Sequence, residues 1–406
     1  MNENGSPNQK AFKRLLKNKP ALFGLWVIAL SVVIAIVGYL IAPDHTPNAN
    51  DQLAAIALKP PGFSVQVLAM RKNSRVVESG WLNRMMRGTD NPYQETPINH
   101  FSIEGDSVFV EKYVGEDRTT GAPLPGKKKA YHLVDVVYAI SDAYPDIVKK
   151  DGKYIFKDLN GVEQGLRTST VSELAQKQLF IRKYYLGTDN FGRDVLSRLI
   201  LGVRISLVVG LISVIISLLL GVSLGALAGY LGGRTDDAIM LVINTIWSIP
   251  TILLVFAIVL AFGRGIGVIF LAVGLTMWVD VARLVRGQVL SLKEVQFVEA
   301  AQSMGFGTAR IILRHILPNI LGPVMVVAAS NFATAILIES GLSYLGFGVQ
   351  PPTPSWGTML NENYGYAIGG KPFLAFAPAL AIMMMVLAFN LVGNGFRDAL
   401  DVKNHD

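Results

Sequence analysis

A polar and charged stretch at residues 298–318, VEAAQSMGFGTARIILRHILP, lies between two long apolar segments. Its spacing predicts a short helix, a turn and a second helix. In the first helix four side chains recur at i, i+3, i+4 and i+7 and share one face: Phe297, Ala300, Ala301 and Met304. A loop between apolar segments rarely carries this much order unless something docks on it. The chemistry we expect here is therefore recognition of a partner.

The second half of the stretch supplies the turn and the second helix. Gly305 can end the first helix in the left-handed conformation, and Thr308 can cap the next helix. Pro318 marks the following boundary. We expect Arg310 and Arg314 to point away from a buried stripe made by Ile312, Leu313, Ile316 and Leu317. The alternative is an ordinary amphipathic loop on the membrane surface.

The composition places the chain in the membrane class. Of its 406 residues 51% are hydrophobic and 17% are charged, which is too apolar for an ordinary soluble protein. Cysteine is absent, which excludes disulfides, thiolate chemistry and cysteine-based zinc or iron–sulfur sites. A bilayer takes about 20 apolar residues to cross. The segments that reach this length are residues 21–42, 205–231, 238–262, 266–285, 319–338 and 373–392.

Basic residues orient these six predicted spans. The first span follows Lys10, Lys13, Arg14, Lys17 and Lys19. It is longer than the apolar core of a signal peptide and no A-x-A site follows, so we expect a retained anchor. The positive-inside rule then puts both chain ends in the cytoplasm. The same side receives Arg234, Arg283, Arg286, Lys293, Arg310, Arg314, Arg397 and Lys403, whereas the outer turn at 263–265 carries only Arg264.

Residues 43–185 form an insertion of different composition, rich in Lys, Asp, Glu, Gly and Pro. With no segment long enough to span, it is expected outside the membrane as a small α+β domain. Strands are predicted at 100–114, around Glu104-Gly105-Asp106, and at 154–156, a helix at 171–185 and a loose region near 119–129. Its role is either packing and stability, or a platform for a partner protein.

Two further motifs flank the spans. LGTDNFGRDVLSRL, at 186–199, contains Gly187 and Gly192, which permit tight turns. An ion-pair cluster is predicted for Asp189, Arg193, Asp194 and Arg198, and the alternative is a simple capped turn before a helix. LGFGVQPPTPSWGTML, at 345–360, is stiffened by Pro351, Pro352 and Pro354, and Trp356 suits a membrane interface.

These strings carry a family resemblance. Glu299-Ala300-Ala301 with Gly305 and Leu317-Pro318 resembles the EAA loop of bacterial ABC-importer permeases. The motif Gly187, Thr188, Asp189, Gly192, Arg193 and Asp194 resembles the GTDxxGRD signature of the oligopeptide/dipeptide/nickel branch. Residues 345–360 and 394–401 are similar to the same branch, specifically to its C-type permease. The resemblance covers residues 10–42 and about 185–401. The insertion and His315 depart from the family pattern.

The resemblance implies an all-α polytopic membrane protein with six transmembrane helices, the type I ABC importer fold, and a small α+β extracytoplasmic insertion. Its implied organisation is a cytoplasmic segment at 1–20, a first transmembrane helix at 21–42, the insertion at 43–185, a permease core at 186–401 with the coupling loop at 287–318, and a cytoplasmic tail at 402–406. The implied location is the bacterial plasma (inner) membrane.

The resemblance also implies the partners. They are a second homologous permease, two ABC ATPase subunits, an extracytoplasmic peptide-binding protein and the lipid bilayer, with no nucleic acid. The residues implied to bind an ATPase subunit are Phe297, Glu299, Ala300, Ala301, Met304, Gly305, Arg310 and Arg314. ATP and Mg would be used by the ATPases, and we expect this chain to bind no cofactor.

Polar and aromatic residues within the spans are candidates for a translocation path, because such groups usually face the protein interior or water. They are Asn244, Trp247, Trp278, Asp280 and Asn331. For Asp280 the alternative is an ion pair with Arg283 one turn later. The glycines Gly221, Gly225 and Gly229 recur at i+4 and are assigned to helix packing.

Several activities are excluded or disfavoured. The sequence lacks the G-x-x-x-x-G-K-[ST] loop and the H-E-x-x-H and G-x-S-x-G motifs, so we expect no ATPase or hydrolase activity in this chain, and no metal site. An ion-coupled secondary transporter would need ionisable groups near the bilayer midplane. A membrane sensor would need a cytoplasmic signalling domain. The favoured function is ATP-driven import of short peptides, with nickel chelates or another small solute as the alternative substrate.

Overall fold

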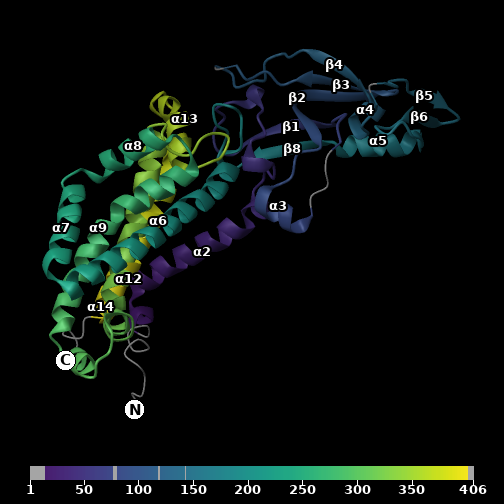
Figure 1. Cartoon of the computed structure of the whole chain (residues 1–406). Helices are drawn as coiled ribbons and strands as arrows, with labels where there is room; N and C mark the ends of the chain where they lie inside the picture. The colour runs from purple at the N-terminus through teal and green to yellow at the C-terminus, as the bar shows by residue number, and fades with distance from the viewer. Residues whose placement is uncertain (1–13, 76–79, 118, 142, 401–406) are drawn as a thin grey trace. The chain divides into compact units, whose positions relative to one another are not determined.

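The computed structural model describes residues 14–75, 80–117, 119–141 and 143–400 (Figure 1). Lys10, Lys13, Asp401, Lys403 and the predicted tail at 402–406 lie outside the described residues. The chain divides into two compact units, each of which is described by itself. The first, the helical unit, comprises Met1–Ile36, Gly202–Asn361 and Phe376–Asp406. The second comprises Val37–Leu201 and Glu362–Ala375 and is called the outer unit after the side of the membrane on which the sequence predicts it.

Among the described residues, five helices are long and apolar enough to cross a membrane. They are α2 (Lys19–Ile41), α6 (Val195–Leu231), α9 (Ile266–Lys293), the continuous helix Thr308–Tyr344 and α14 (Phe373–Leu400). A sixth span is available if α7 (Gly233–Trp247) and α8 (Thr251–Phe262) count as one broken span. The apolar segments predicted from sequence are thus confirmed as helices or as parts of helices.

The third predicted span is wrong as a single straight helix. α7 and α8 are bent by 90° at a break between Trp247 and Thr251. Pro250 lies in this break, directly before α8. Proline has no N–H and its ring clashes with the preceding turn, so a helix stops or kinks there. The hydropathy of residues 238–262 is continuous, which is why composition alone predicted one span.

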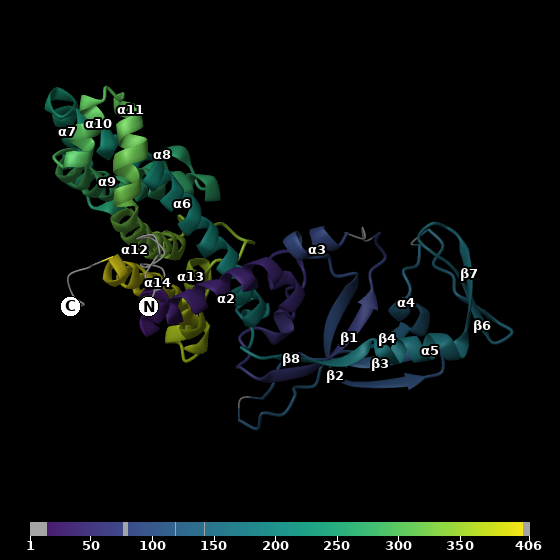
Figure 2. The ribbon, with the colours of Figure 1, turned by 90° about the horizontal axis from the view of Figure 1, so that it is seen from below.

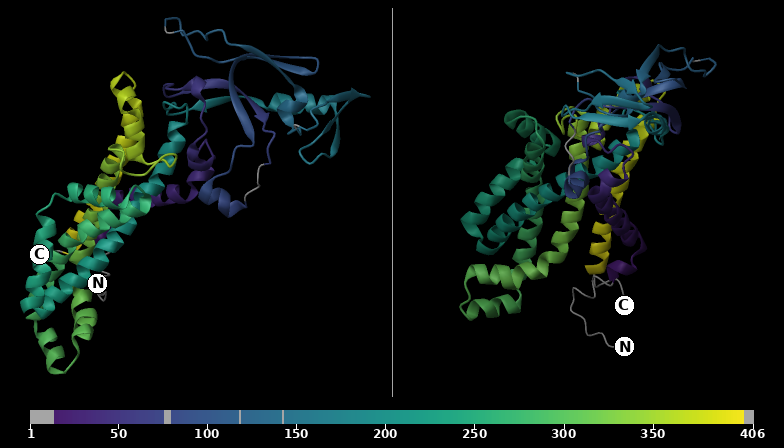
Figure 3. Two further views of the ribbon diagram at one scale, coloured as in Figure 1. Left: turned by 45° about the horizontal axis from the view of Figure 1, so that its top comes forward. Right: turned by 90° about the vertical axis from the view of Figure 1, so that its right-hand side faces the viewer.

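Glycines set how closely α6 approaches α9. A Cβ on Gly221 would lie 2.5 Å from Cβ of Val281, and one on Gly225 would lie 2.4 Å from the Ala282 carbonyl oxygen. For Gly229 the nearest atom is the Arg286 carbonyl oxygen, at 2.8 Å. The predicted packing role of this i+4 series is confirmed, since a side chain at any of these positions would push the helices apart. α9 also packs against α8 and against α12 (Leu317–Tyr344) (Figures 2 and 3).

The outer unit contains two antiparallel sheets. The larger has the order β4-β3-β2-β1-β8 and the smaller β5-β6-β7. Their strands are β1 (Phe63–Arg71), β2 (Tyr93–Glu104), β3 (Ser107–Lys112), β4 (Lys128–His132), β5 (Val148–Lys150), β6 (Lys153–Lys157), β7 (Glu163–Arg167) and β8 (Leu179–Tyr184). Shorter helices accompany them: α3 (Trp81–Arg87), α4 (Leu133–Val137), α5 (Thr168–Lys177) and, from residue 362 onward, the second part of α13 (Trp356–Ile368).

The sequence predicted parts of this unit well. The strand pair around Glu104-Gly105-Asp106 is β2 and β3, with Glu104 opposite Ser107, and the strand at 154–156 lies in β6. The helix predicted at 171–185 is wrong in its second half. There the chain forms β8, because residues 179–184 pair with β1 along its length, a contact that local spacing does not reveal.

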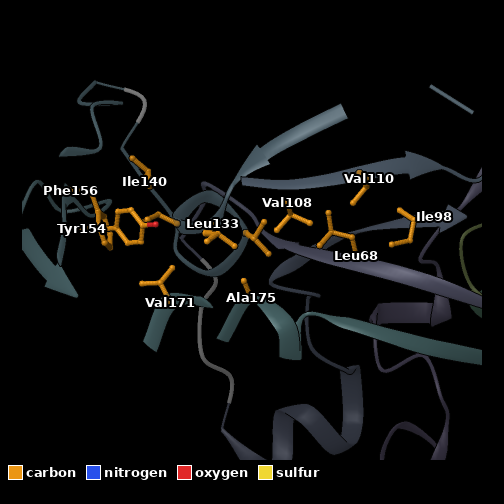
Figure 4. Close-up of a cluster of buried hydrophobic side chains, with 12 residues drawn as sticks. Leu68, Ile98, Val108, Val110, Leu133, Ile140, Tyr154, Phe156, Val171 and Ala175 are labelled. Carbon is orange, nitrogen blue, oxygen red and sulfur yellow. The ribbon is translucent and has the colours of Figure 1, made fainter. Parts of the chain in front are cut away.

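One apolar cluster contains side chains from both sheets and from α4 and α5. It includes Leu68 from β1, Val108 from β3, Leu133 from α4, Phe156 from β6 and Val171 from α5 (Figure 4). These side chains are almost completely buried. Each contributes on the order of 1.5–3 kcal/mol of transfer free energy, before the entropy of ordering the chain is counted.

Candidate functional site

The stretch at residues 295–317, hereafter called the coupling segment after the role that the resemblance implies, begins with α10 (Gln296–Ser303). Val295 precedes α10 in an extended conformation. The helix ends at Gly305, whose φ is +76°. The Phe306 N–H donates to the Ala301 carbonyl at 3.2 Å and the Gly305 N–H to that of Gln302 at 2.9 Å. The predicted left-handed turn at Gly305 is confirmed, and it closes α10 in the manner of a helix C-cap.

α10 buries one side and exposes the other. Val298 and Ala301 are buried against Val285, Ile312 and Ile316. Glu299 and Ala300 are exposed, as are Phe297 and Met304, at 41% and 64%. The predicted face of Phe297, Ala300, Ala301 and Met304 is therefore divided: Ala301 belongs to the core and the other three face outward. Large apolar side chains beside a carboxylate form a surface suited to docking.

The second half of the coupling segment differs from prediction at three positions. Thr308 does not cap the helix: Gly307 precedes the first turn and no side-chain capping bond forms. Leu313 is 65% exposed, whereas Ile311, Ile312 and Ile316 are buried. Pro318 lies at the start of α12 (Leu317–Tyr344), but this boundary is a change of helix type and not a break. The helix runs without interruption from Thr308 to Tyr344 through a π-helical turn, Ile311–Ile316.

Physical reasons account for these differences. A π turn shifts the phase of the helix, so the side-chain spacing of a regular α-helix assigns Leu313 to the wrong side. Pro318 is one of the first two residues of α12 (Leu317–Tyr344), where its missing N–H is tolerated. Leu313 thus adds a third exposed large apolar side chain to the coupling segment.

Aromatic and basic groups pack on one another at residues 306–315, hereafter the tip of the coupling segment. The Arg310 guanidinium lies 4.9 Å from the centre of the Phe306 ring. The His315 ring stacks on the same ring at a centroid distance of 6.0 Å. Arg310 and Arg314 are both exposed. The histidine that departs from the family pattern is thus part of a local stack that orders the tip.

The predicted path residues separate into two groups. Asn244 and Trp247 come together with Arg283, which donates to Asn244 Oδ1 at 2.6 Å and lies 3.9 Å over the Trp247 ring. Asp280 is exposed and, within the described residues, forms no ion pair with Arg283, so that alternative is wrong. Sequence reasoning missed Arg283 as a member of this exposed polar cluster. Whether the cluster lines a path stays a prediction.

The remaining two path candidates are buried. Trp278 packs with Ile243, Val279 and Ala282. Asn331 donates to the Ser217 hydroxyl at 3.3 Å. Both arrangements are those of residues that hold neighbouring helices together, and their predicted role in a path is untested.

Sequence reasoning also missed a fully buried carboxylate, Glu339, in α12. It accepts from the Ser343 hydroxyl at 2.7 Å and from the Ser340 hydroxyl at 3.4 Å. The Ser343 hydroxyl also accepts the Val349 N–H at 3.1 Å. The span predicted from sequence stopped at residue 338, one position before Glu339. Glu339 fixes Ser343 and thereby the loop that follows α12.

The motif at residues 186–199, hereafter the signature turn, requires its glycines. Gly187 and Gly192 have φ of +76° and +75°. An added Cβ would lie 2.3 Å from the Lys59 carbonyl oxygen at Gly187 and 2.0 Å from the Leu53 carbonyl oxygen at Gly192. The predicted tight turns are confirmed, and the close approach to residues 53–59 supplies a second reason for glycine.

The charged side chains of the signature turn form a buried ion-pair network. Arg193 contacts Asp189 at 2.6 Å and Glu362 at 2.5 Å. Arg198 contacts Glu362 at 3.3 Å and Asp189 at 3.8 Å. The two arginines and Asp189 are nearly inaccessible to solvent. The cluster was predicted for Asp189, Arg193, Asp194 and Arg198. Asp194 is not part of it, and Glu362, from α13, was missed.

Asp194 has a different role from the one predicted. Its carboxylate accepts the Ser197 N–H at 2.8 Å and the Ser197 hydroxyl, so it caps α6. The Thr188 hydroxyl donates to the Ile56 carbonyl and accepts the Lys59 N–H at 2.9 Å. Burial raises the pKa of Asp194 above its ordinary value. Asp194 forms no ion pair within the described residues.

A cavity of about 410 Å³ opens in the outer unit between the end of α2, β1 and β2. Asp51, Glu95 and Arg182 line it, with Arg182 2.5 Å from Glu95 and 3.8 Å from Asp51. Burial raises the pKa of both Asp51 and Glu95. None of these residues was singled out from the sequence, because they come from three distant segments that only the sheet brings together.

Comparison with known families gives two matches. Residues 221–405 match the family described as "Binding-protein-dependent transport system inner membrane component". Residues 6–61 match "N-terminal TM domain of oligopeptide transport permease C". The coupling segment lies within the first match. Residues 62–220, which hold most of the insertion and the signature turn, lie outside both.

Named relatives agree with these matches. The chain is 47% identical over 221 residues to the oligopeptide transport system permease protein OppC of Escherichia coli (strain K12), which covers 54% of this chain and 73% of the relative. It is 40% identical over 222 residues to OppC of Bacillus subtilis (strain 168), and this match covers 55% of this chain and 72% of that relative. The glutathione transport system permease protein GsiD of an Escherichia coli O6:K15:H31 strain is 44% identical over 221 residues, covering 54% and 73%.

Among solved structures, the chain is similar to an inward-facing form of the MetNI methionine ABC transporter. The identity is 20%, the match covers 50% of this chain and 96% of that one, and the TM-score is 0.42. The sequence relatives and both family matches carry the assignment. The chain belongs to the binding-protein-dependent ABC transport permeases, in the branch of the oligopeptide permease OppC, and is an inner membrane protein with several spans.

Proposed function

We propose that this chain is a pore-forming permease subunit of an ATP-driven importer of short peptides. It pairs with a second homologous permease, and two ABC ATPase subunits bind on the cytoplasmic side, one of them at the coupling segment. A peptide-binding protein delivers the solute from outside. Both chain termini lie in the cytoplasm. ATP and Mg are bound by the ATPases, and this chain supplies the path and the mechanical link.

The exposed apolar face of the coupling segment is the observation that carries this proposal. Phe297 and Met304 project outward from α10, beside the carboxylate of Glu299. The opposite side of α10 is anchored by Val298 and Ala301 in a core that includes α9 and α12. A force applied to the exposed face is thus transmitted to two long helices rather than absorbed by a loose loop.

ATP-driven closure of the ATPases brings the two coupling segments of the permease pair together. The spans then change from inward-facing to outward-facing, and the binding protein releases its peptide into the opening. Names of the relatives favour peptides as the solute, since two are oligopeptide permeases and one is a glutathione permease. Selection among peptides is expected to lie largely in the binding protein.

Reconstitution with a matched pair of glycine variants tests the mechanical link. Gly305 has a φ of +76°, which a β-branched residue resists. Gly307 is extended, with φ −67° and ψ 152°, and a Cβ there meets nothing within 4 Å. In liposomes with both permeases, the ATPases and the binding protein, Gly305→Val should abolish peptide uptake while ATP hydrolysis continues. Gly307→Val should retain most of the uptake.

Two outcomes would contradict the proposal. The first is normal uptake by Gly305→Val at normal protein levels. The second is peptide uptake in liposomes that contain no ATPase subunits, provided that this uptake is lost when ionophores remove the proton and sodium gradients. Such a result would favour an ion-coupled transporter that uses a group such as Glu339. Competition between labelled and unlabelled peptides in the same liposomes would define the substrate class.

A further inference from the structure

The seven-residue helix α3, WLNRMMR, is amphipathic. At about 100° per residue, Trp81, Leu82, Met85 and Met86 fall within an arc of roughly 140°. The polar residues Asn83, Arg84 and Arg87 occupy the opposite side. Trp81, Leu82 and Met86 are 66%, 63% and 58% exposed. In a water-soluble domain this apolar arc would face a core, but here it faces outward.

The C-terminal end of α3 is fixed against the end of a membrane span. Gly88, which ends α3, approaches so closely that a Cβ would lie 2.5 Å from the His45 carbonyl oxygen and 2.9 Å from Cε1 of Tyr39. The Thr89 N–H donates to the same carbonyl at 2.9 Å. Tyr39 belongs to the last turn of α2, and its hydroxyl accepts the Asn48 N–H at 3.0 Å.

α2 is long and apolar enough to cross a membrane, so hydrocarbon is expected to give way to water at its last turn. Its Leu40 and Ile41 are 45% and 51% exposed, as expected for a lipid-facing helix. Immediately beyond it the chain turns polar, with Asp44 buried and bonded to Thr46 and Ser197. Because Gly88 packs on Tyr39, the C-terminal end of α3 lies within about one helical turn of this boundary, and the seven-residue helix itself is only about 10 Å long.

The polar side of α3 has a defined direction. Arg84 lines the 410 Å³ cavity together with Asp44 and His45, the residues that follow α2. The arc opposite Arg84 is therefore turned away from the cavity. Tryptophan, leucine and methionine on one side with arginine on the other is the composition of helices that lie in the interface plane of a bilayer.

We propose that α3 is an interfacial helix that inserts Trp81, Leu82 and Met86 into the outer leaflet of the phospholipid bilayer beside α2. Arg84 and Arg87 then remain at the level of the lipid phosphates, with charges complementary to them. Because Gly88 at the end of α3 packs on Tyr39 in the last turn of α2, α3 continues the lipid-facing surface of that last turn. It thereby gives the insertion a second attachment to the membrane besides its chain connections.

The absence of cysteine makes a direct test possible. Leu82→Cys and, as the matched control on the polar side, Asn83→Cys are spin-labelled in the full-length protein within the reconstituted transporter. The liposomes contain phosphatidylethanolamine and phosphatidylglycerol. Collision rates with oxygen, which concentrates in lipid, and with a water-soluble nickel chelate are then measured. We expect the oxygen-to-nickel ratio at position 82 to exceed that at position 83 several-fold.

Each other result overturns the proposal. Equal, high access of the nickel chelate to both positions would place α3 in water. Low access of both reagents at position 82 would mean that a protein, such as the second permease, covers this face. A measurement independent of labelling is the Trp81 fluorescence, taken as the difference between the native chain and Trp81→Phe. Lipids brominated near the headgroup should quench it, and an unquenched difference signal would also refute the insertion.

Discussion

The coupling segment and the signature turn are alike in sequence but opposite in structure. Both combine glycines in left-handed turns with acids and arginines. The signature turn buries its charges, and Asp189, Arg193 and Arg198 form ion pairs with one another and with Glu362. The coupling segment leaves Glu299, Arg310 and Arg314 exposed, and with them Phe297 and Met304.

The difference separates a motif whose charged side chains pair within their own unit from a motif whose side chains are left exposed. Buried charges that pair with distant parts of their own unit organise that unit, and removing one leaves another uncompensated. Exposed apolar and charged side chains on a rigid helix contribute little to the fold, so they are available to a partner. Stability measurements should therefore separate the two motifs.

The largest effect is expected for Asp189→Ala. The Asp189 carboxylate accepts from Arg193 Nε at 2.6 Å and from the Phe191 N–H at 2.9 Å. Its loss leaves two buried arginines sharing Glu362, which should lower the free energy of unfolding by about 3–5 kcal/mol. Thermal unfolding in detergent, with Glu299→Ala as the exposed-acid control, measures this. Equal stability of the two variants would erase the contrast between the motifs.

A smaller loss is expected for Gly192→Ala. The left-handed conformation alone costs about 1–2 kcal/mol for a residue with a Cβ, and the Leu53 carbonyl oxygen at 2.0 Å adds a steric term. The matched control is Gly305→Ala, which has a similar φ but no atom within 4 Å of its Cβ. In the same unfolding assay Gly192→Ala should be the less stable variant. If Gly305→Ala were instead the less stable variant, residues 53–59 would have to move aside easily to accommodate the added Cβ at position 192.

Variants of the docking face should change binding more than stability. Phe297→Ser and Met304→Ser are expected to alter the free energy of unfolding by less than about 0.5 kcal/mol, as for other exposed sites. Under the proposed function they should reduce co-purification of the ATPase subunits several-fold. Val298→Ser, from the buried side of the same helix, should instead destabilise the protein. Undiminished ATPase capture by the first two variants would argue against docking at this face.

Arg310→Ala is expected to have only a small effect on stability and no separate effect on ATPase capture. Only the contact with the Phe306 ring is lost, and such an exposed cation–π contact contributes about 0.5–1 kcal/mol. The unfolding midpoint should therefore shift only slightly, with Arg314→Ala as a control that lacks this ring contact. A large shift at Arg310 would mean that the tip of the coupling segment is a stability element after all.

Much of this architecture followed from local patterns. Long apolar runs predicted the spans, because only helices satisfy backbone hydrogen bonds in hydrocarbon. Gly305, Gly187 and Gly192 predicted turns, because glycine alone adopts left-handed backbone without a steric penalty. The strand pair at Glu104-Gly105-Asp106 followed from alternation around a turn signal. Each of these features depends on residues close together in the chain.

The tertiary structure decided what depends on distant contacts. Glu362 meets Arg193 across a sequence separation of 169, and β8 forms only because β1 offers it an edge. The π turn exposed Leu313, and the break at Pro250 divided an apolar run that composition reads as one span. Periodicity shows that one face of a helix or strand is apolar. It does not show whether lipid, the protein core or a partner covers that face. Which of the three covers that face depends on the packing of the whole chain.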